Sequence, residues 1–302
     1  MSRQVKIGLI FVMLFILGFY AVEVSPRFLG GKLSKTGGTK TEESCSQKIS
    51  QSVKASLETL SADSWGIYCV SDKSLLVLMD GKNINKRQGI ASITKIATDY
   101  LAEQTWNDEE VFKIPAGAIG YGTSRRYLPG EEFKVGELLS SLIVESDNDV
   151  ARTFAIQYGT EMFLRRMNLF AKNLGLQNTT FRDPAGLDIQ NEPSNLSTVA
   201  DVAKMAKFVF TNSRHFKYDA HESTREIYSV TGFHHSAVAT NKLLATPLQK
   251  NIIAWKTGDT GEARKNLVVM FSNEKGENFV SVVLHSEDHM GDTRRIIEGV
   301  VK

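Results

Sequence analysis

The stretch Ala91-Ser92-Ile93-Thr94-Lys95-Ile96-Ala97-Thr98 starts a predicted apolar helix and holds a serine and a lysine three residues apart. This spacing places Ser92 and Lys95 about one turn apart on one face, so the lysine amine can reach the serine hydroxyl and take its proton. A serine nucleophile needs such a base nearby. A helix-capping serine followed by a solvated lysine gives the same pattern, and roughly one such tetrad is expected by chance in a chain of this length.

Two further motifs follow the first along the chain. They are Ser146-Asp147-Asn148 and Lys256-Thr257-Gly258, and the three motifs together are the signature of penicillin-binding proteins and class A β-lactamases. With this set the chain resembles the D-alanyl-D-alanine carboxypeptidase family of low-molecular-mass penicillin-binding proteins, over roughly residues 60 to 302. The stretches that look like family landmarks are residues 87–98, 127–139, 146–151, 181–188, 197–201, 241–244 and 256–267.

The resemblance implies a catalytic role for five polar side chains. Ser92 is expected to attack the substrate carbonyl and become acylated, with Lys95 as its base. Lys95 must be neutral for this role, and burial together with the charge of Lys256 would lower its pKa. Ser146 is expected to relay a proton toward the leaving amine, while the Asn148 amide points at the substrate or at Lys95. Helix capping is the alternative role for Ser146 and Asn148.

The third motif is expected to lie on an edge strand along which the substrate binds as an added strand. Thr257 and Gly258 belong to this strand, and Gly258 leaves room for close approach of the substrate backbone. The resemblance implies an oxyanion hole formed by the backbone N–H groups of Ser92 and Asp259. It also implies that Thr260 helps to hold the terminal carboxylate of the substrate.

Two positions depart from the family pattern. Ala263-Arg264 stands where the family usually has Ala-Gly after the strand, so a bulky cation replaces a glycine. Asp292 stands about where the family has an arginine that binds the substrate carboxylate, with Arg294 and Arg295 just beyond it. These departures would change recognition of the substrate carboxylate. They would also change the preference for carboxypeptidase or endopeptidase cleavage.

Hydrophobic patterning predicts an α/β (α+β) architecture. Strands are expected at residues 65–70, 74–79, 267–271 and 279–284, with helices at 43–60 and 292–302. Strands near both ends of the chain imply one antiparallel sheet completed by the two termini, with helices on its faces. Residues 135–144, 149–158, 160–174 and a helix that follows Ser197-Thr198 and ends at about Phe210 add a helical subdomain, with a cleft between the two regions. The resemblance implies a β-lactamase/transpeptidase-like fold for this domain, residues 45–302.

The amino-terminal sequence predicts a membrane anchor followed by a flexible linker. Residues 7–22 contain no charge, and we expect a transmembrane helix at 7–24 after a short cytoplasmic end at 1–6. A signal peptide is the alternative, although no small-x-small cleavage site follows. Residues 25–44 are rich in Gly, Ser, Thr and Lys and read as a flexible linker. The positive charges flanking the apolar run favour the opposite orientation, so the expected location, a single-pass protein of the bacterial cell membrane with an extracytoplasmic domain, follows from the resemblance.

The two cysteines leave two possibilities. The sequence favours unpaired thiols, with Cys69 buried in a strand, because it supplies no geometry for a bond. A bridge between Cys45 and Cys69, joining the first helix to the first strand, is the alternative in an oxidising compartment.

Composition excludes several classes of function. A net charge of +2 gives no reason to expect a polyanionic partner, and the basic and aromatic patterns of nucleic-acid binding are missing. His285 and His289 are four residues apart and His234 adjoins His235, but no third ligand completes a zinc pattern. We therefore predict no metal and no cofactor.

The predicted function is that of a serine-type D-alanyl-D-alanine carboxypeptidase, which the resemblance implies acts on peptidoglycan stem peptides and is inhibited by β-lactams. One alternative is a D,D-endopeptidase that uses the same residues. A β-lactamase would need a carboxylate to activate the deacylating water, and Glu192 offers one only superficially. A non-catalytic penicillin-binding sensor is the remaining alternative.

Overall fold

The computed structural model describes residues 45, 49–71, 73, 75–120 and 126–301. The predicted cytoplasmic end (1–6), transmembrane helix (7–24) and linker (25–44) lie outside these residues. Within the described ranges, no helix combines the length and the apolar character needed to cross a membrane.

Five strands form the central sheet, in the order β2-β1-β11-β10-β9. Their bounds are Ser64–Val70 (β1), Leu76–Lys82 (β2), Ile252–Thr260 (β9), Arg264–Ser272 (β10) and Asn278–Ser286 (β11). Every neighbouring pair is antiparallel, and β1 pairs directly with β11. The prediction of an antiparallel sheet completed by both ends of the domain is therefore confirmed, and β9 is one of its edges.

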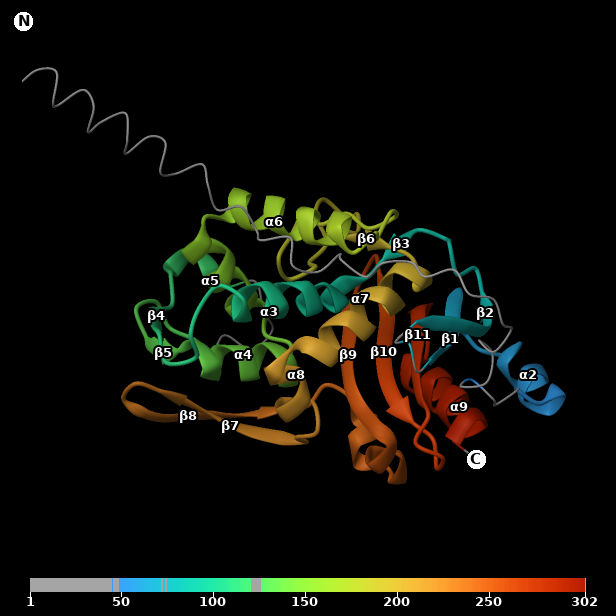
Figure 1. The fold of residues 1–302 in the computed structure, drawn as a ribbon. Helices are drawn as coiled ribbons and strands as arrows, with labels where there is room; N and C mark the ends of the chain where they lie inside the picture. Colours follow the sequence, from blue (N-terminus) through green and yellow to red (C-terminus); the bar gives the residue numbers. More distant parts are fainter. Residues whose placement is uncertain (1–44, 46–48, 72, 74, 121–125, 302) are drawn as a thin grey trace, which may run out of the picture. The chain divides into compact units, whose positions relative to one another are not determined.

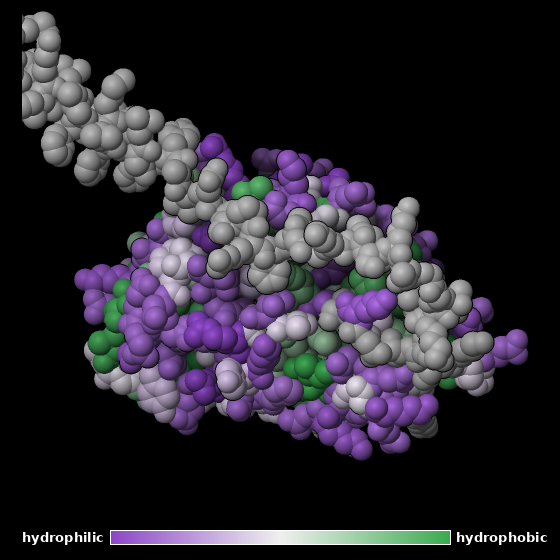
Figure 2. Space-filling view, viewed as in Figure 1, coloured by the Kyte–Doolittle hydropathy of each residue, from purple (hydrophilic) through white to green (hydrophobic). Residues whose placement is uncertain are grey.

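Two helices pack on this sheet, α7 (Val199–Asn212) and α9 (His289–Val301). Consecutive residues from Phe279 to Leu284 in β11 are buried, so both faces of that strand are covered. Val and Phe predominate in β10 and β11, and these side chains suit a strand that is buried on both faces. The space-filling view shows a mainly hydrophilic face with small, separate hydrophobic patches (Figure 2), as expected when the apolar side chains form an internal core.

A helical region adjoins the β9 side of the sheet (Figure 1). It contains α3 (Lys95–Glu103), α4 (Val135–Val144), α5 (Asn148–Tyr158), α6 (Thr160–Asn173) and α8 (Arg214–Asp219). Helix α3 packs against α4, α5, α6 and α7. The helix that starts at Lys95 is thus surrounded by other helices, which confirms the predicted helical subdomain.

Shorter elements complete the fold. The hairpin of β7 and β8 projects beside α4 (Figure 1) and was absent from the sequence prediction. The helix predicted at 43–60 is described only as Gln51–Leu57 (α2). The remaining bounds are Gln88–Gly89 (β3), Val111–Lys113 (β4), Glu132–Lys134 (β5), Leu196–Ser197 (β6), Thr224–Ser229 (β7), Gly232–Val238 (β8), and the 3₁₀ helices Ala91–Thr94 (η1), Ala116–Ala118 (η2), Lys242–Ala245 (η3) and Pro247–Asn251 (η4).

The expectation of two unpaired thiols is wrong, because Cys45 and Cys69 form a disulfide. Their Cα atoms lie 6.0 Å apart, within the range a disulfide requires. Cys69 is a buried residue of β1, and the bond attaches the segment before α2 to the sheet. The sequence could not reveal this pairing, since the distance between the two residues depends on the fold.

Candidate active site

Ser92 and Lys95 meet where a 3₁₀ helix changes into an α-helix. Ser92 lies in η1 and Lys95 is the first residue of α3, and residues three apart eclipse each other in 3₁₀ geometry. Nζ of Lys95 lies 2.6 Å from Oγ of Ser92. Ala91, directly before Ser92, has a φ of 46°, a left-handed conformation that costs energy in a residue with a side chain. The predicted nucleophile therefore follows a strained backbone position and contacts the predicted base.

The Lys95 amine is buried and hydrogen-bonded on several sides. Besides Ser92, it donates to Oδ1 of Asn148 at 2.7 Å and to the carbonyl oxygen of Ala185 at 2.9 Å. Burial lowers the pKa of Lys95 to about 7, although the charges of Asp147 and Asp183 act in the opposite direction. A large fraction of this lysine is consequently neutral near pH 7, and in that form the 2.6 Å contact lets the Ser92 hydroxyl donate to the amine.

The Ser146-Asp147-Asn148 motif forms the turn between α4 and α5. Ser146 has a φ of 64°, and Asp147 caps α5 by accepting a hydrogen bond from the backbone N–H of Val150 at 3.0 Å. Helix capping is therefore the role of Asp147 rather than of Ser146 or Asn148. Asn148 is the first residue of α5, and its side-chain oxygen points at Lys95. This is one of the two orientations predicted for its amide, the other being toward the substrate.

The Lys256-Thr257-Gly258 motif lies on β9, the edge strand beside η1. A Cβ on Gly258 would lie 2.7 Å from the carbonyl oxygen of Ile90 and 3.1 Å from the backbone nitrogen of Ile93. Only glycine therefore allows the strand to pack this closely against the turn that carries Ser92. The predicted edge-strand location of the third motif is confirmed.

Lys256 is fully buried, and its amine donates to the carbonyl oxygen of Thr257 at 3.2 Å. Burial holds the pKa of Lys256 well below its ordinary value, and the charge of Lys95 lowers it further. The predicted electrostatic interaction between the two lysines thus acts on Lys256, while burial is the main influence on Lys95. Burial thus favours the neutral form of both amines.

The last two predicted substrate-binding residues differ in their surroundings. Asp259 is exposed, and only its backbone N–H was expected to contribute. Thr260 is partly buried, and its hydroxyl donates to Oδ1 of Asp188 at 2.8 Å. The hydroxyl groups of Thr257 and Thr240 form a hydrogen bond of 2.6 Å, in which either can be the donor. A carboxylate held next to Thr260 is a feature that the sequence did not predict.

The sequence model of the family described as D-alanyl-D-alanine carboxypeptidase matches residues 50–288, which include all three motifs. The chain belongs to this family. A curated relative is D-alanyl-D-alanine carboxypeptidase DacF of Bacillus subtilis, 34% identical over 193 residues that cover 61% of this chain and 48% of the relative. The chain thus spans about half the length of the curated relative that it matches.

Solved structures similar to this chain confirm the penicillin-binding protein and transpeptidase fold. The Streptomyces K15 DD-transpeptidase is 25% identical with a TM-score of 0.70, covering 80% of this chain and 97% of that one. Penicillin-binding protein D2 of Listeria monocytogenes in its ampicillin-bound form is 24% identical with a TM-score of 0.68, covering 81% and 99%. The predicted architecture, with helices on an antiparallel sheet, is therefore confirmed.

The residues that depart from the carboxypeptidase family pattern have local partners. Asp292 is fully buried near the start of α9, where it accepts hydrogen bonds from Ser61 and Ser286 and pairs with Arg295 at 2.7 Å. Arg264 has a φ of 54° and forms an ion pair with Glu287. Asp292 consequently joins α9 to the segment before β1, a role different from that of a carboxylate-binding arginine.

Sequence reasoning missed the residues that support Lys95 from the side of Ala185. Asp183 and Asn195 are both buried and hydrogen-bond to the backbone of this segment. Residues 181–188 resemble a landmark of the D-alanyl-D-alanine carboxypeptidase family, but the resemblance assigns no role to Asp183. The signal that was available is Asp-Pro-Ala-Gly, because an aspartate followed by Pro and Gly is typical of a turn.

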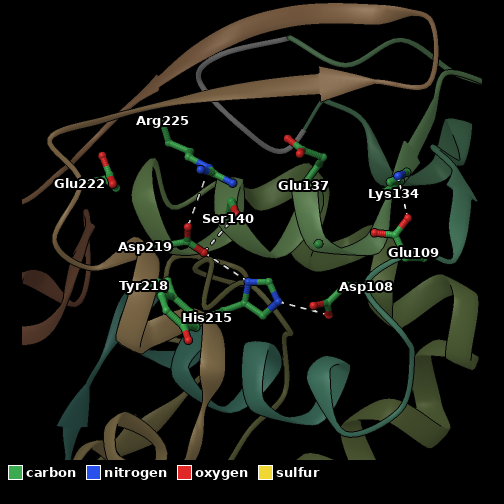
Figure 3. A pocket seen from close by; sticks show the side chains of 11 residues that line it. Asp108, Glu109, Lys134, Glu137, Ser140, His215, Tyr218, Asp219, Glu222 and Arg225 are labelled. Atoms are coloured by element: carbon green, nitrogen blue, oxygen red, sulfur yellow. Dashed lines mark hydrogen bonds and ion pairs between the residues drawn. The ribbon is translucent and has the colours of Figure 1, made fainter.

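A separate cavity of about 470 Å³ lies between α4, α8 and β7 (Figure 3), and its lining includes none of the predicted site residues. At its centre His215 contacts Asp219 at 3.2 Å and Asp108 at 3.3 Å. Burial acts to lower the pKa of His215, but the hydrogen bonds and charges of these carboxylates and of Asp99 raise it to about 9. The lining groups pair largely with one another, so we interpret this cluster as a structural ion-pair network.

Proposed function

We propose that this chain is a serine-type D-alanyl-D-alanine carboxypeptidase that removes the terminal D-alanine from peptidoglycan stem peptides. The observation that carries the proposal is the contact between a buried lysine with a pKa of about 7 and the Oγ atom of Ser92, 2.6 Å away. Membership of the family supports the same activity. A positioned base and an activated serine are what acyl transfer to an enzyme requires.

In the proposed reaction, Oγ of Ser92 attacks the carbonyl carbon of the penultimate D-alanine while its proton passes to Nζ of Lys95. The backbone N–H groups of Ser92 and Asp259 stabilise the developing oxyanion. The tetrahedral intermediate collapses, the peptide bond breaks, and the leaving amine receives, through Ser146, the proton that Lys95 took from Ser92. Water then attacks the acyl carbon while giving a proton to neutral Lys95, the ester bond to Oγ of Ser92 breaks, and Oγ takes the proton back from Lys95 as the shortened peptide leaves with a new carboxylate.

Substrate binding is proposed to use β9, an edge strand of the sheet. The stem peptide would add as a strand along β9, where Gly258 keeps the backbone close to η1. Thr257, Thr260 and the buried Lys256 would bind the terminal carboxylate, with Asn148 orienting the substrate and Lys95. Thr260 would then exchange its hydrogen bond to Asp188 for one to the substrate, and the bound carboxylate would favour the protonated form of Lys256. Because the related protein D2 has been solved with ampicillin bound, we also propose that β-lactams acylate Ser92.

The location of the enzyme is part of the proposal. We infer that residues 7–24 anchor the chain in a bacterial membrane and that residues 25–44 connect this anchor to an extracytoplasmic domain. The apolar run at 7–22 supports the anchor. The Cys45–Cys69 disulfide supports an oxidising compartment.

Release of free D-alanine from a peptide ending in D-Ala-D-Ala tests this function, with the full chain and its Ser92→Ala variant compared side by side. We expect one D-alanine per peptide with the wild type and none with Ser92→Ala. Cleavage restricted to cross-linked peptides would indicate an endopeptidase instead. Rapid hydrolysis of benzylpenicillin without peptide cleavage would indicate a β-lactamase, and acylation without any turnover would indicate a sensor.

A further inference from the structure

The third acceptor of the Lys95 amine is a backbone carbonyl outside any helix or strand. The carbonyl oxygen of Ala185 accepts from Nζ of Lys95 at 2.9 Å, and residues 181–188 contain neither kind of element. The position of this oxygen therefore depends on interactions that shape the loop. Since the same amine contacts Ser92, a displaced Ala185 carbonyl would also displace the base from the nucleophile.

Asp183 supplies the main interaction that shapes this loop. Its Oδ1 atom accepts hydrogen bonds from the backbone N–H groups of Ala185 at 2.9 Å, Gly186 at 2.7 Å and Leu187 at 3.1 Å. The N–H of Gly186 and the C=O of Ala185 belong to one planar trans peptide unit, in which they point in opposite directions. By binding that N–H, Asp183 directs the carbonyl of Ala185 away from itself and toward Lys95.

Neighbouring groups hold Asp183 and its turn in place. Oδ2 of Asp183 forms an ion pair with Arg152 at 3.0 Å, and Arg152 lies on α5, the helix that begins with Asn148. The Asn195 amide accepts from the N–H of Asp183 at 3.1 Å and donates to its carbonyl at 2.7 Å. Gly186, with a φ of 84°, lies so close to Ala91 that a Cβ would be 2.0 Å from the Ala91 carbonyl oxygen. The turn thus contacts the backbone beside Ser92 as well as the base.

We propose that Asp183 is a positioning residue for acylation, because its carboxylate forms the turn that holds the Lys95 amine against Ser92 and places a negative charge near that amine. The inference rests on the proposed function, since it concerns the same lysine acting as base. It assigns a role to a side chain that touches neither the nucleophile nor the substrate. Asp183 influences acylation in two ways: it orients the Ala185 carbonyl that binds Lys95, and its negative charge acts on the Lys95 amine.

Four ionisable groups bear on the protonation of the Lys95 amine. Asp183 and Asp147 favour the protonated form of Lys95, from the loop and from the turn before α5. Lys256 on β9 also faces this site, but the repulsion between the two amines lowers the pKa of Lys256. Arg152 offsets part of the charge of Asp183 because the two form an ion pair. Changes to Asp183 and to Arg152 must therefore shift the titration of Lys95 in opposite directions.

The test is the pH profile of the rate of acylation by benzylpenicillin, measured with the full chain in detergent between pH 5 and pH 9. Asp183→Asn keeps an oxygen that can accept the three N–H bonds but removes the charge, so the midpoint should fall by about one pH unit. Arg152→Gln exposes the charge of Asp183, so the midpoint should rise. Asp183→Ala removes the acceptor as well, and we expect at least a tenfold lower plateau rate.

Asp201→Asn is the matched control, because Asp201 is about as buried as Asp183 and also accepts a backbone N–H, from Asn178 at 2.7 Å. Its midpoint should equal that of the wild type. An unchanged midpoint in Asp183→Asn, or only a uniform loss of rate, overturns the inference while the wild type still acylates. If Asp183→Asn does not fold, an unchanged midpoint in Arg152→Gln overturns it. A wild type that forms no adduct contradicts the proposed function instead.

Discussion

Gly258 on the edge strand packs directly against the backbone of Ile90 in the turn that carries Ser92. A Cβ at position 258 would lie 2.7 Å from the carbonyl oxygen of Ile90, closer than real Cβ contacts allow. The opposing atom belongs to the backbone of a buried turn, so the strand and the turn must separate to accommodate a side chain. The spacing between β9 and η1, which the proposed substrate would span, is therefore determined by this glycine.

Gly258→Ala should lower the rate of acylation by benzylpenicillin at least tenfold, because it moves the third motif away from Ser92. Stopped-flow or mass-spectrometric rates would measure the loss. Gly117→Ala is the control, since a Cβ there would make only an ordinary 3.8 Å contact with Ile156. Equal rates in the two variants would show that the close approach at Gly258 has no effect on the reaction.

The acylation rate of the wild type should rise with pH and level off above a midpoint near 7. Only neutral Lys95 can accept the Ser92 proton, and burial lowers the pKa of this lysine to about 7. Below the midpoint the rate should fall about tenfold per pH unit, in proportion to the neutral fraction. Lys95→Arg should abolish acylation, whereas Lys217→Arg on the exposed surface should leave the profile unchanged. A midpoint near 10 would contradict this account.

The contribution of His215 to stability should decrease as the pH rises from about 6.5 to about 9, while Lys95, whose pKa of about 7 lies below its ordinary value, contributes in the opposite direction above pH 7. The native pKa of His215, about 9, exceeds its ordinary value of 6.5, so its contribution is fully present below pH 6.5 and is lost as the proton leaves. The loss is on the order of 3 kcal/mol at most. Urea unfolding of the wild type and of His215→Gln at pH 6 and pH 9 isolates this contribution, because the lysines are common to both proteins. The loss of stability caused by His215→Gln should be larger at pH 6 than at pH 9, whereas His221→Gln, at an exposed site, should match the wild type at both values.

Reduction of the Cys45–Cys69 disulfide should destabilise the domain by about 3 kcal/mol, since it frees a loop with a sequence separation of 24. Urea unfolding with and without reductant measures the difference. Cys45→Ser should show the reduced stability under both conditions. A wild type whose unfolding midpoint is unaffected by reductant would indicate that the bond contributes nothing to stability.

The sequence predicted the parts of the fold that depend on local patterns and on motif order. Alternation and β-branched runs located β1, β2, β10 and β11, and the three motifs located Ser92, Lys95 and Lys256. The β7–β8 hairpin was missed because several of its hydrophobic residues are exposed, Phe233 among them, so its strands lack a clear buried face. The Cys45–Cys69 bond was missed because it depends on tertiary distance.

The sequence also could not predict the residues that hold the Lys95 amine in place. Asp183 acts through backbone N–H groups and through a carbonyl that belongs to Ala185, and such contacts leave no spacing rule in the sequence. The influence of Asp147 and Asp183 on Lys95 likewise depends on which loops meet at the amine. Residue types in a motif can indicate the chemistry, but the charges around a buried group follow only from the three-dimensional arrangement.

The central claim, that Lys95 activates Ser92 for acylation, is tested most directly by intact-protein mass spectrometry of the full chain treated with benzylpenicillin at pH 8. We predict a mass increase of one penicilloyl group, located by peptide mapping on the peptide that contains Ser92. Ser92→Ala and Lys95→Arg, each checked for a native circular dichroism spectrum, should show no adduct. An adduct on another residue, or one that persists in folded Ser92→Ala, would contradict the account.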